Sequence, residues 1–304
     1  MRQLRVGSRA SKLAMVQTDE VVSLLQVSFP EIDLRVVPVR TGGDTSPETS
    51  LTQMGRGIFV KEIEAALGAG RIDLAVHSLK DLPTQLAPGL TIGAVCHRAD
   101  PRDVLVNRWG CQLDKLPAGA RIGTSSPRRT AQLKAVRTDV DIVPIRGNIE
   151  TRIEKSREDG YDGVILAAAG LIRMGWQDQI SEFLSPEICI PEVGQGALAI
   201  ETRSDDSKIL AMLKDVNHTP TNKEVASERE FLKELGGGCT APVTAFARLE
   251  GEELHISSMA ALSDGSVIFR FQKTYDSAHP KSAGARAANG LLRTGASEII
   301  SIVT

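Results

Sequence analysis

The clearest candidate for chemistry is a cysteine, Cys239, which follows three glycines in the segment LGGGCTAP. Glycine lets a backbone turn sharply at a helix end and expose the next side chain. An exposed thiol is a liability in a stable protein, so its presence indicates use. A protease-type nucleophile also needs a histidine partner, and nothing in the sequence pairs His218 or His255 with this cysteine. The other cysteines lie in apolar or ordinary contexts and are expected to be inert: Cys96, Cys111 and Cys189.

The segment GTSSPRR (123–129) places two cations where a helix ordinarily avoids them. Ser126 is a good N-cap, and Pro127 suits the first helical position because its missing amide would be unpaired there. Arg128 and Arg129 then fall in the first turn, where the helix dipole disfavours positive charge. They are either two solvated surface arginines or part of a site in which helix amides and guanidinium groups converge on an anion. We favour the anion site.

Other arginines stand at the ends of further predicted elements. Arg9 follows the first strand, and Arg173 follows the strand in GVILAAAGLIR. Arg146 ends a strand in IRGNIETR, and Arg152 lies one turn into the next helix. Because ligands of open α/β sheets bind outside the carboxyl ends of the strands, these sites together predict a cleft for a ligand with many negative charges. The residues do not separate carboxylates from phosphates, although there is no Walker-type glycine loop with its lysine.

Asp81 lies in VHSLKDLP (76–83), just after a strand that looks buried and beside Lys80. One interpretation is a loop or helix-cap carboxylate that is paired with its lysine. The other is a carboxylate held among cations at the cleft, where it stays ionised and accepts hydrogen bonds from a substrate that carries N–H groups. His77 precedes it and is interpreted as structural.

Two α/β domains of similar plan must position these residues. Strands are predicted at 4–9, 32–39 and 73–79, with helices at 11–27 and 58–67. This alternation predicts a mostly parallel sheet covered on both faces. After HRADPR (97–102) the alternation of strands and helices begins a second time. It consists of the strand RIGTS, a helix at 127–136, the strand VDIVPIR, a helix at 149–159 and the strand GVILAAAG. The run PEVGQGALAIET (191–202) is interpreted as a return crossing from the second domain to the first.

The last part of the chain has a different pattern, which predicts a small α+β domain. Thr221 and Glu224 in TNKE form a predicted capping box, and the helix that follows ends at three glycines. Asp264-Gly265 predicts a hairpin turn before the strand VIFRFQKTY. A further helix is expected near 281–293.

Composition excludes several classes of protein. The 304 residues carry a formal net charge of −2 and no apolar run of the roughly 18 residues that a membrane span needs. The four cysteines have no metal-ligand spacing, which argues against a structural zinc site and a disulfide framework. The opening MRQLRVGSRASKLA lacks an apolar signal core, so we expect a cytoplasmic protein.

Taken together, the motifs resemble those of one family, the porphobilinogen deaminases. The matching segments run in family order from Gly7 to Pro242: GSRASKLA, RTGGD, GRGIFVKEIE, DLAVHSLKDLP, GTSSPRR, IRGNIETR, LAAAGLIRMG, PEVGQGALAIE and GGGCTAP. Two departures are visible. The segment after the cysteine, PVTAFARLEG, differs from the PIGAYA-like sequence that is commoner in the family. The stretch 45–55 falls where the family has a mobile loop.

The resemblance implies a three-domain fold. Two α/β domains are similar to the lobes of periplasmic binding proteins and span 1–96 with 197–216, and 97–196. A small C-terminal α+β domain spans 217–304 and carries the cofactor cysteine. The implied cofactor is a dipyrromethane, built from two substrate molecules and joined to Cys239 by a thioether.

The resemblance also implies roles for individual residues. Asp81 matches the catalytic aspartate of the family. Other positions match residues that hold the acetate and propionate groups of the cofactor and the growing chain. Those expected at the cofactor, besides Asp81, are Lys80, Ser125, Ser126, Arg128, Arg129 and Arg146. Those expected at the substrate are Arg9, Ser11, Arg152 and Arg173.

The chemistry that the resemblance implies agrees with these residue types. Porphobilinogen carries an acetate, a propionate and an aminomethyl group; loss of ammonia leaves a cationic azafulvene, which the free α-carbon of the bound chain attacks. Asp81 is expected to stabilise that cation and to hold the pyrrole N–H. Four rounds and hydrolytic release would give hydroxymethylbilane. The enzyme is expected to act as a monomer that passes its product to uroporphyrinogen-III synthase, without nucleic-acid or membrane partners.

Two other classes of function remain weaker. A non-catalytic two-lobed anion-binding protein would explain the fold rhythm but neither Cys239 nor Asp81. A nucleic-acid binder is disfavoured by the net charge of −2 and by only eleven aromatic residues (Phe 7, Tyr 2, Trp 2). Ammonia release from porphobilinogen separates the enzyme from both.

Overall fold

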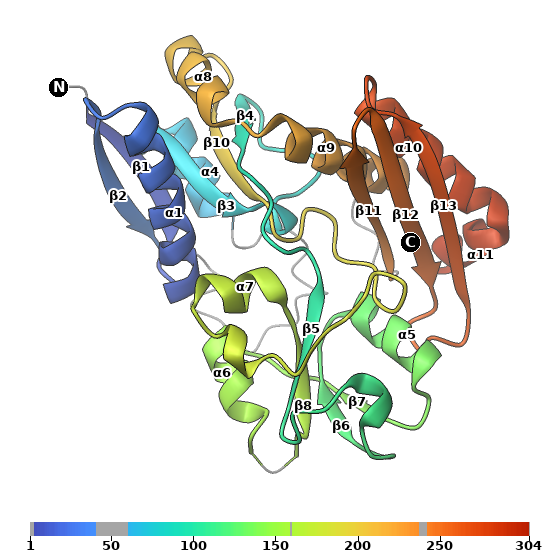
Figure 1. The fold of residues 1–304 in the computed structure, drawn as a ribbon. Helices are drawn as coiled ribbons and strands as arrows, with labels where there is room; N and C mark the ends of the chain where they lie inside the picture. The colour runs from blue at the N-terminus through green and yellow to red at the C-terminus, as the bar shows by residue number, and fades with distance from the viewer. Residues whose placement is uncertain (1–2, 41–59, 159, 237–241, 304) are drawn as a thin grey trace. The chain divides into compact units, whose positions relative to one another are not determined.

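The computed structural model describes residues 3–40, 60–158, 160–236 and 242–303. The chain divides into two compact units. Met1–Ala99 and Ala197–Lys223 form the first unit, and Asp100–Gly196 and Glu224–Thr304 form the second (Figure 1). Cys239 and the stretch 45–55 lie outside the described residues, and so does the predicted start of the helix at 58–67. No helix in the described ranges is long and apolar enough to cross a membrane.

The first unit is built on a five-stranded sheet of order β2-β1-β3-β10-β4. Its strands are β1 (Gln3–Arg9), β2 (Asp33–Val39), β3 (Leu74–Ser78), β4 (Leu90–Val95) and β10 (Leu198–Arg203). Its helices are α1 (Lys12–Ser28), α4 (Lys61–Gly68) and α8 (Ser207–Leu213), with 3-10 turns η1 (Leu79–Asp81) and η4 (Lys214–Val216). Leu74 and Val76 pack in the cluster that contains α1 and α8, whereas Ala75 packs with α4. Because side chains alternate along a strand, helices cover both faces of this sheet, as predicted.

The second unit contains a sheet with the same plan, in the order β7-β6-β8-β5-β9. Its strands are β5 (Asp103–Asn107), β6 (Arg121–Gly123), β7 (Asp141–Val143), β8 (Gly163–Ala167) and β9 (Glu182–Phe183). Its helices are α5 (Pro127–Val136), α6 (Ile149–Lys155) and α7 (Ala168–Arg173), with 3-10 turns η2 (Leu113–Lys115) and η3 (Gln177–Gln179). The two sheets therefore confirm the predicted pair of similar α/β domains.

The prediction of mostly parallel sheets is confirmed, since four of the five strands in each sheet run in one direction, but one strand in each runs the opposite way and was not predicted to do so. In the first sheet β1 pairs in parallel with β2 and β3, but β10 is antiparallel to both β3 and β4. In the second sheet β6 pairs in parallel with β7 and β8, and β5 is antiparallel to β8 and β9. β5 and β10 are the strands that directly follow the chain's passage from one unit to the other. An apolar run has the same period in either direction, so the sequence does not show which way it enters a sheet.

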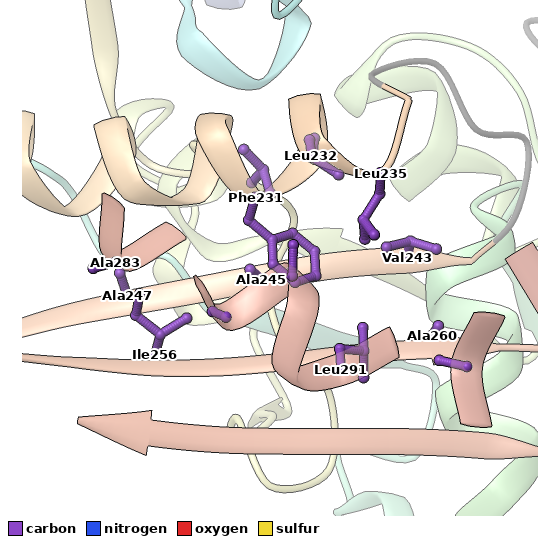
Figure 2. Packing of buried hydrophobic residues seen from close by; sticks show 14 of the residues in the cluster. Phe231, Leu232, Leu235, Val243, Ala245, Ala247, Ile256, Ala260, Ala283 and Leu291 are labelled. Carbon is purple, nitrogen blue, oxygen red and sulfur yellow. The ribbon is translucent and has the colours of Figure 1, made fainter. Parts of the chain in front are cut away.

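The C-terminal part of the second unit is the predicted α+β module. Its antiparallel sheet β11-β12-β13 consists of Val243–Glu250, Glu253–Ala261 and Ile268–Asp276. Its helices are α9 (Thr219–Glu234, whose first turns belong to the first unit), α10 (Pro280–Leu291) and α11 (Ser297–Val303), with a π-helical turn η5 (Leu292–Ala296) between the last two. Phe231 of α9 is completely buried among Leu235, Ala245, Ile256 and Leu291 (Figure 2). The antiparallel pairing of β12 with β13 confirms the predicted hairpin, and Asp264 in its turn accepts a hydrogen bond from Ser266 N (3.0 Å).

Two local predictions were wrong. The capping box at Thr221 and Glu224 does not form, because α9 begins at Thr219 and both residues lie inside it. The Thr221 hydroxyl accepts a hydrogen bond from Arg98 N (3.1 Å), and Glu224 Oε1 accepts one from Leu249 N (3.0 Å). The segment GVILAAAG is not one strand either, since β8 ends at Ala167 and α7 begins at the next residue. An apolar run of this kind does not distinguish a strand from a buried helix.

Candidate active site

Several of the predicted site residues of the first unit meet at one edge of its sheet. β1 ends at Arg9, and Ser11 caps α1 by accepting a hydrogen bond from Ala14 N (3.4 Å). β3 ends at Ser78 and is followed by η1, which contains Lys80 and Asp81. Because β1 and β3 are parallel neighbours, their carboxyl ends lie at the same edge. All four predicted residues there are half-buried: Arg9, Ser11, Lys80 and Asp81.

Hydrogen bonds on both sides hold the turn that contains Asp81. Ser78 Oγ donates to Gln17 Oε1 of α1 (3.0 Å), and Leu79 N donates to the carbonyl of Ala197 just before β10 (3.0 Å). His77 is buried, with its Nε2 3.0 Å from Glu201 Oε2 on β10, which agrees with its interpretation as structural. These contacts fix the backbone that positions Asp81.

In the second unit, the loops after β6 and β7 meet through Ser125. Its hydroxyl donates to Ile145 O (2.8 Å) and accepts from Ile145 N (3.1 Å), so this predicted cofactor residue joins the two loops. Ser126 caps α5 by accepting from Arg129 N (3.4 Å), and Pro127 is the first helical residue, as predicted. Arg146 follows β7 and is half-buried.

The last two predicted arginines of this unit have half-buried side chains that bond to backbone carbonyls. Arg152 Nε donates to Gly147 O (2.8 Å). A side chain at Gly147 would be strained, since its φ is +119° and a Cβ would lie 2.6 Å from Thr151. Arg173 is the final residue of α7 rather than the first after a strand, and its NH2 donates to Gly196 O (3.2 Å).

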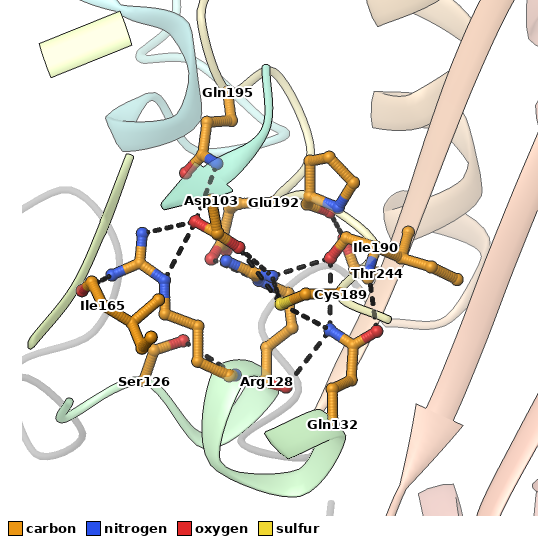
Figure 3. Close-up of polar contacts among 12 residues, drawn as sticks. Asp103, Ser126, Arg128, Gln132, Ile165, Cys189, Ile190, Glu192, Gln195 and Thr244 are labelled. Carbon is orange, nitrogen blue, oxygen red and sulfur yellow. Dashed lines mark hydrogen bonds and ion pairs between the residues drawn. The ribbon is translucent and has the colours of Figure 1, made fainter. Parts of the chain in front are cut away.

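Arg128 and Arg129 are the main surprise, because both are buried and share one carboxylate. Their exposed fractions are 4% and 6%, and the carboxylate is that of Asp103, which is completely buried at the start of β5 (Figure 3). Arg128 NH1 lies 2.7 Å from Asp103 Oδ2. Arg129 donates to Asp103 Oδ1 through Nε (3.0 Å) and NH2 (2.7 Å), and through NH1 to Ile165 O (2.9 Å). The interpretation as two solvated surface arginines is therefore wrong.

The cluster includes further polar side chains from the segment 189–195. Gln195 Nε2 donates to Asp103 Oδ1 (3.0 Å), and the Cys189 thiol donates to Asp103 Oδ2 (3.3 Å). Gln132 of α5 accepts from Ile190 N (2.8 Å) and donates to Ile190 O (3.2 Å). Figure 3 shows Gln195 and Cys189 of this segment and Arg128 of α5 pointing toward the carboxylate of Asp103 on β5.

The electrostatics of the cluster keep Asp103 ionised. Burial by itself would raise the pKa of the Asp103 carboxyl, but the charges of Arg128 and Arg129 outweigh it and hold this pKa well below its usual range. For Arg128, the charge of Asp103 outweighs the opposing effect of burial and raises its pKa. Burial, together with the Asp103 charge, raises the pKa of the Cys189 thiol to about 12, which supports the prediction that this cysteine is inert.

Sequence reasoning missed Asp103, Gln132 and Gln195. A signal was present for Asp103, which opens the apolar run DVLV, because an acidic residue at the start of a buried strand is rare without a partner. No comparable signal marks the two glutamines. Among the described residues, no three His, Cys, Asp or Glu side chains gather as a metal site would require.

Comparison with known proteins decides the family. A family model described as the dipyrromethane cofactor binding domain of porphobilinogen deaminase matches residues 4–211, and one described as its C-terminal domain matches 222–293. The chain belongs to the porphobilinogen deaminase family. The porphobilinogen deaminase of Alkaliphilus metalliredigens is 44% identical and covers 100% of this chain and 96% of its own. That of Pelotomaculum thermopropionicum is 46% identical over 98% of this chain and 96% of its own.

Members of this family polymerise porphobilinogen into hydroxymethylbilane. The cofactor-domain model spans all the predicted site residues of the two α/β sheets, and Cys239 falls within the range of the C-terminal model. Among solved structures, a nutrient-binding protein from Burkholderia cenocepacia aligns over 76% of this chain and 95% of its own, at 14% identity and a TM-score of 0.44.

The residue types present fit a dipyrromethane. Such a group carries carboxylates and pyrrole N–H groups. Guanidinium groups of Arg9, Arg146, Arg152 and Arg173 stand half-buried in or beside segments that follow strands, and Asp81 supplies an acceptor for N–H.

Proposed function

We propose that Asp81 is the catalytic carboxylate of this porphobilinogen deaminase and that Cys239 anchors its dipyrromethane. The observation that carries the proposal is the position of Asp81: it is half-buried in a turn fixed by two hydrogen bonds, at the sheet edge that also contains Arg9 and Ser11. A carboxylate held in this way needs no reorganisation when charge develops next to it.

Asp81 performs two tasks in this proposal. Its oxygens accept the pyrrole N–H of the substrate, and its charge stabilises the cation that forms when ammonia leaves. At about 4 Å and an effective dielectric constant near 20, one charge pair is worth roughly 4 kcal/mol, or on the order of a thousandfold in rate. The dipyrromethane, when bound, supplies the carbon nucleophile and remains attached through its thioether.

The predicted binding residues divide into two groups by the carboxylates they bind. Arg9, Ser11, Arg152 and Arg173 are assigned to the incoming substrate and the growing chain. Lys80, Ser125, Ser126, Arg128, Arg129 and Arg146 are assigned to the cofactor. Arg128→Lys should lower cofactor content, because an ammonium cannot reproduce two-pronged contacts. Full cofactor occupancy in a double substitution of Arg128 and Arg129 would contradict this division.

The decisive experiment compares Asp81→Asn with Asp81→Glu. Asn removes the charge at constant size, so ammonia release from porphobilinogen should fall by about a thousandfold while the intact mass still includes the cofactor. Glu keeps the charge with altered reach and should retain part of the turnover. Asn turnover at a tenth or more of the wild-type rate would refute the electrostatic role.

We also propose three domains, at 1–96 with 197–216, 97–196 and 217–304. The boundaries of the two compact units, after Ala99 and Gly196, fall close to the first two of these limits and support them. The enzyme is proposed to act in the cytoplasm as a monomer and to pass its product to uroporphyrinogen-III synthase. Light scattering of the purified protein tests the monomer, and coupled turnover with that synthase tests the transfer.

A further inference from the structure

We propose that Asp103 is a positioning residue for cofactor assembly, because it holds the guanidinium groups of Arg128 and Arg129 in a fixed arrangement. The inference rests on the proposed role of these two arginines in cofactor binding. Asp103 itself is completely buried, so it acts through the arginines and not by touching a ligand.

Each oxygen of the Asp103 carboxylate belongs to a different arginine. Oδ1 accepts hydrogen bonds from Nε and NH2 of Arg129, and Oδ2 lies 2.7 Å from NH1 of Arg128. The two planar guanidinium groups are thereby fixed relative to the carboxylate in orientation as well as in distance. A contact through a single atom would fix the distance alone. Rotation of the carboxylate would break contacts to both arginines at once.

Neighbouring side chains prevent such a rotation. Gln195 donates to Oδ1 at 3.0 Å, and the Cys189 thiol donates to Oδ2 at 3.3 Å. Arg128 NH1 also donates to Ile190 O at 2.7 Å, in the same segment as those two residues. The carboxylate and the first turn of α5 therefore form one rigid polar unit inside the protein.

The charges of this unit do not cancel inside it. Two guanidinium groups face one buried carboxylate, which leaves one positive charge in a region of low dielectric. Glu192 is the next carboxylate, but its side chain is 25% exposed and its Oε2 lies 3.4 Å from Arg128 Nε, so its contact is looser. A buried excess cation favours a ligand carboxylate, and Asp103 determines where that cation is held.

The test measures how porphobilinogen loads the cofactor onto the full-length chain. Wild type, Asp103→Asn and Glu192→Gln are prepared without cofactor and titrated with porphobilinogen, and the gain in intact mass is recorded. For Asp103→Asn, the half-saturating concentration for loading should rise about tenfold or more. Glu192→Gln, which removes the looser carboxylate beside the same arginine, should stay within about twofold of the wild type.

A merely structural role of Asp103 would lower the folded fraction but leave the half-saturating concentration of the folded protein unchanged, and that result would overturn the inference. If Asp103→Asn does not fold, the same comparison is made between Arg129→Gln and the double variant Asp103→Asn/Arg129→Gln. In Arg129→Gln the Asp103 carboxylate has only Arg128 to hold, and in the double variant that carboxylate is absent. Equal half-saturation in that pair likewise overturns it. A wild-type protein that gains no mass and releases no ammonia would refute the proposed function instead.

Discussion

Replacing Asp103 by Asn should change both the stability of the protein and the way stability depends on pH. The substitution keeps the size of the side chain and removes its charge. The amide NH2 would then face either Arg128 NH1 or the donors of Arg129, all of which lie 2.7 to 3.0 Å from the carboxylate. The N–H groups of the amide would then face N–H groups of an arginine with no acceptor between them. The two buried guanidinium groups would also lose their shared counter-ion.

The magnitude follows from the burial of the cluster. Removing one partner of a buried ion pair costs about 3–5 kcal/mol, because the remaining charge stays desolvated and uncompensated. For a folding unit of about 150–250 residues this corresponds to a fall in Tm of roughly 6–20 °C. Asp139→Asn is the matched control, since Asp139 pairs with Arg137 at the other end of α5 but is 46% exposed and should change Tm little.

The pH dependence has a definite sign. Because folding lowers the pKa of Asp103, its stabilising effect is complete above the value of about 4 that an aspartate has in an unfolded chain, and is lost as the pH falls below it. Wild-type Tm should therefore fall more steeply than that of Asp103→Asn between about pH 5 and pH 3. Calorimetry over this range measures both curves. Parallel curves, or a variant within 2 °C (~1 kcal/mol) of the wild type at pH 7, would refute the reasoning.

Three further predictions concern other parts of the chain. Cys239→Ser should be isolated without dipyrromethane and inactive, because a hydroxyl is a poor substitute for the thiol, and its Tm should be lower because a native-state ligand is lost. Intact masses of variant and wild type that differ only by the substitution would contradict this. Gly284→Ala should destabilise by about 1–3 kcal/mol in thermal melts, since its Cβ would lie 2.1 Å from a backbone carbonyl of α9. Gly68→Ala should not, because beyond its chain neighbours and its own helix backbone a Cβ there would meet no atom within 4 Å. At pH 9 (about the ordinary thiol pKa), a thiol reagent should modify the half-buried Cys111 in the folded protein. Cys189 should stay unmodified until the protein unfolds, because it is buried and its pKa is raised to about 12. Equal labelling rates of the two cysteines would contradict this prediction.

Local sequence was sufficient for elements whose signals are local. The cap at Ser126 and the proline after it located the start of α5 to the residue, because capping depends on groups within one helical turn. The helix α1 and the strands β1, β2, β3, β6, β7 and β8 were found from the spacing of apolar residues, whereas β4, β5 and β9 were not predicted. The same local reading failed at Thr221, whose hydroxyl bonds to Arg98 rather than to its own helix.

The sequence by itself also determined which residue types are available for chemistry and their order, and this was enough to indicate the family. It marked Arg128 and Arg129 as out of place in a first helical turn. Only the tertiary structure supplied the reason, which is the Asp103 carboxylate, 25 and 26 residues earlier in the chain and on a strand of opposite direction to its neighbours. Periodicity and capping act over a few residues, whereas the pairing of a buried charge depends on which distant segments the folded sheet brings together.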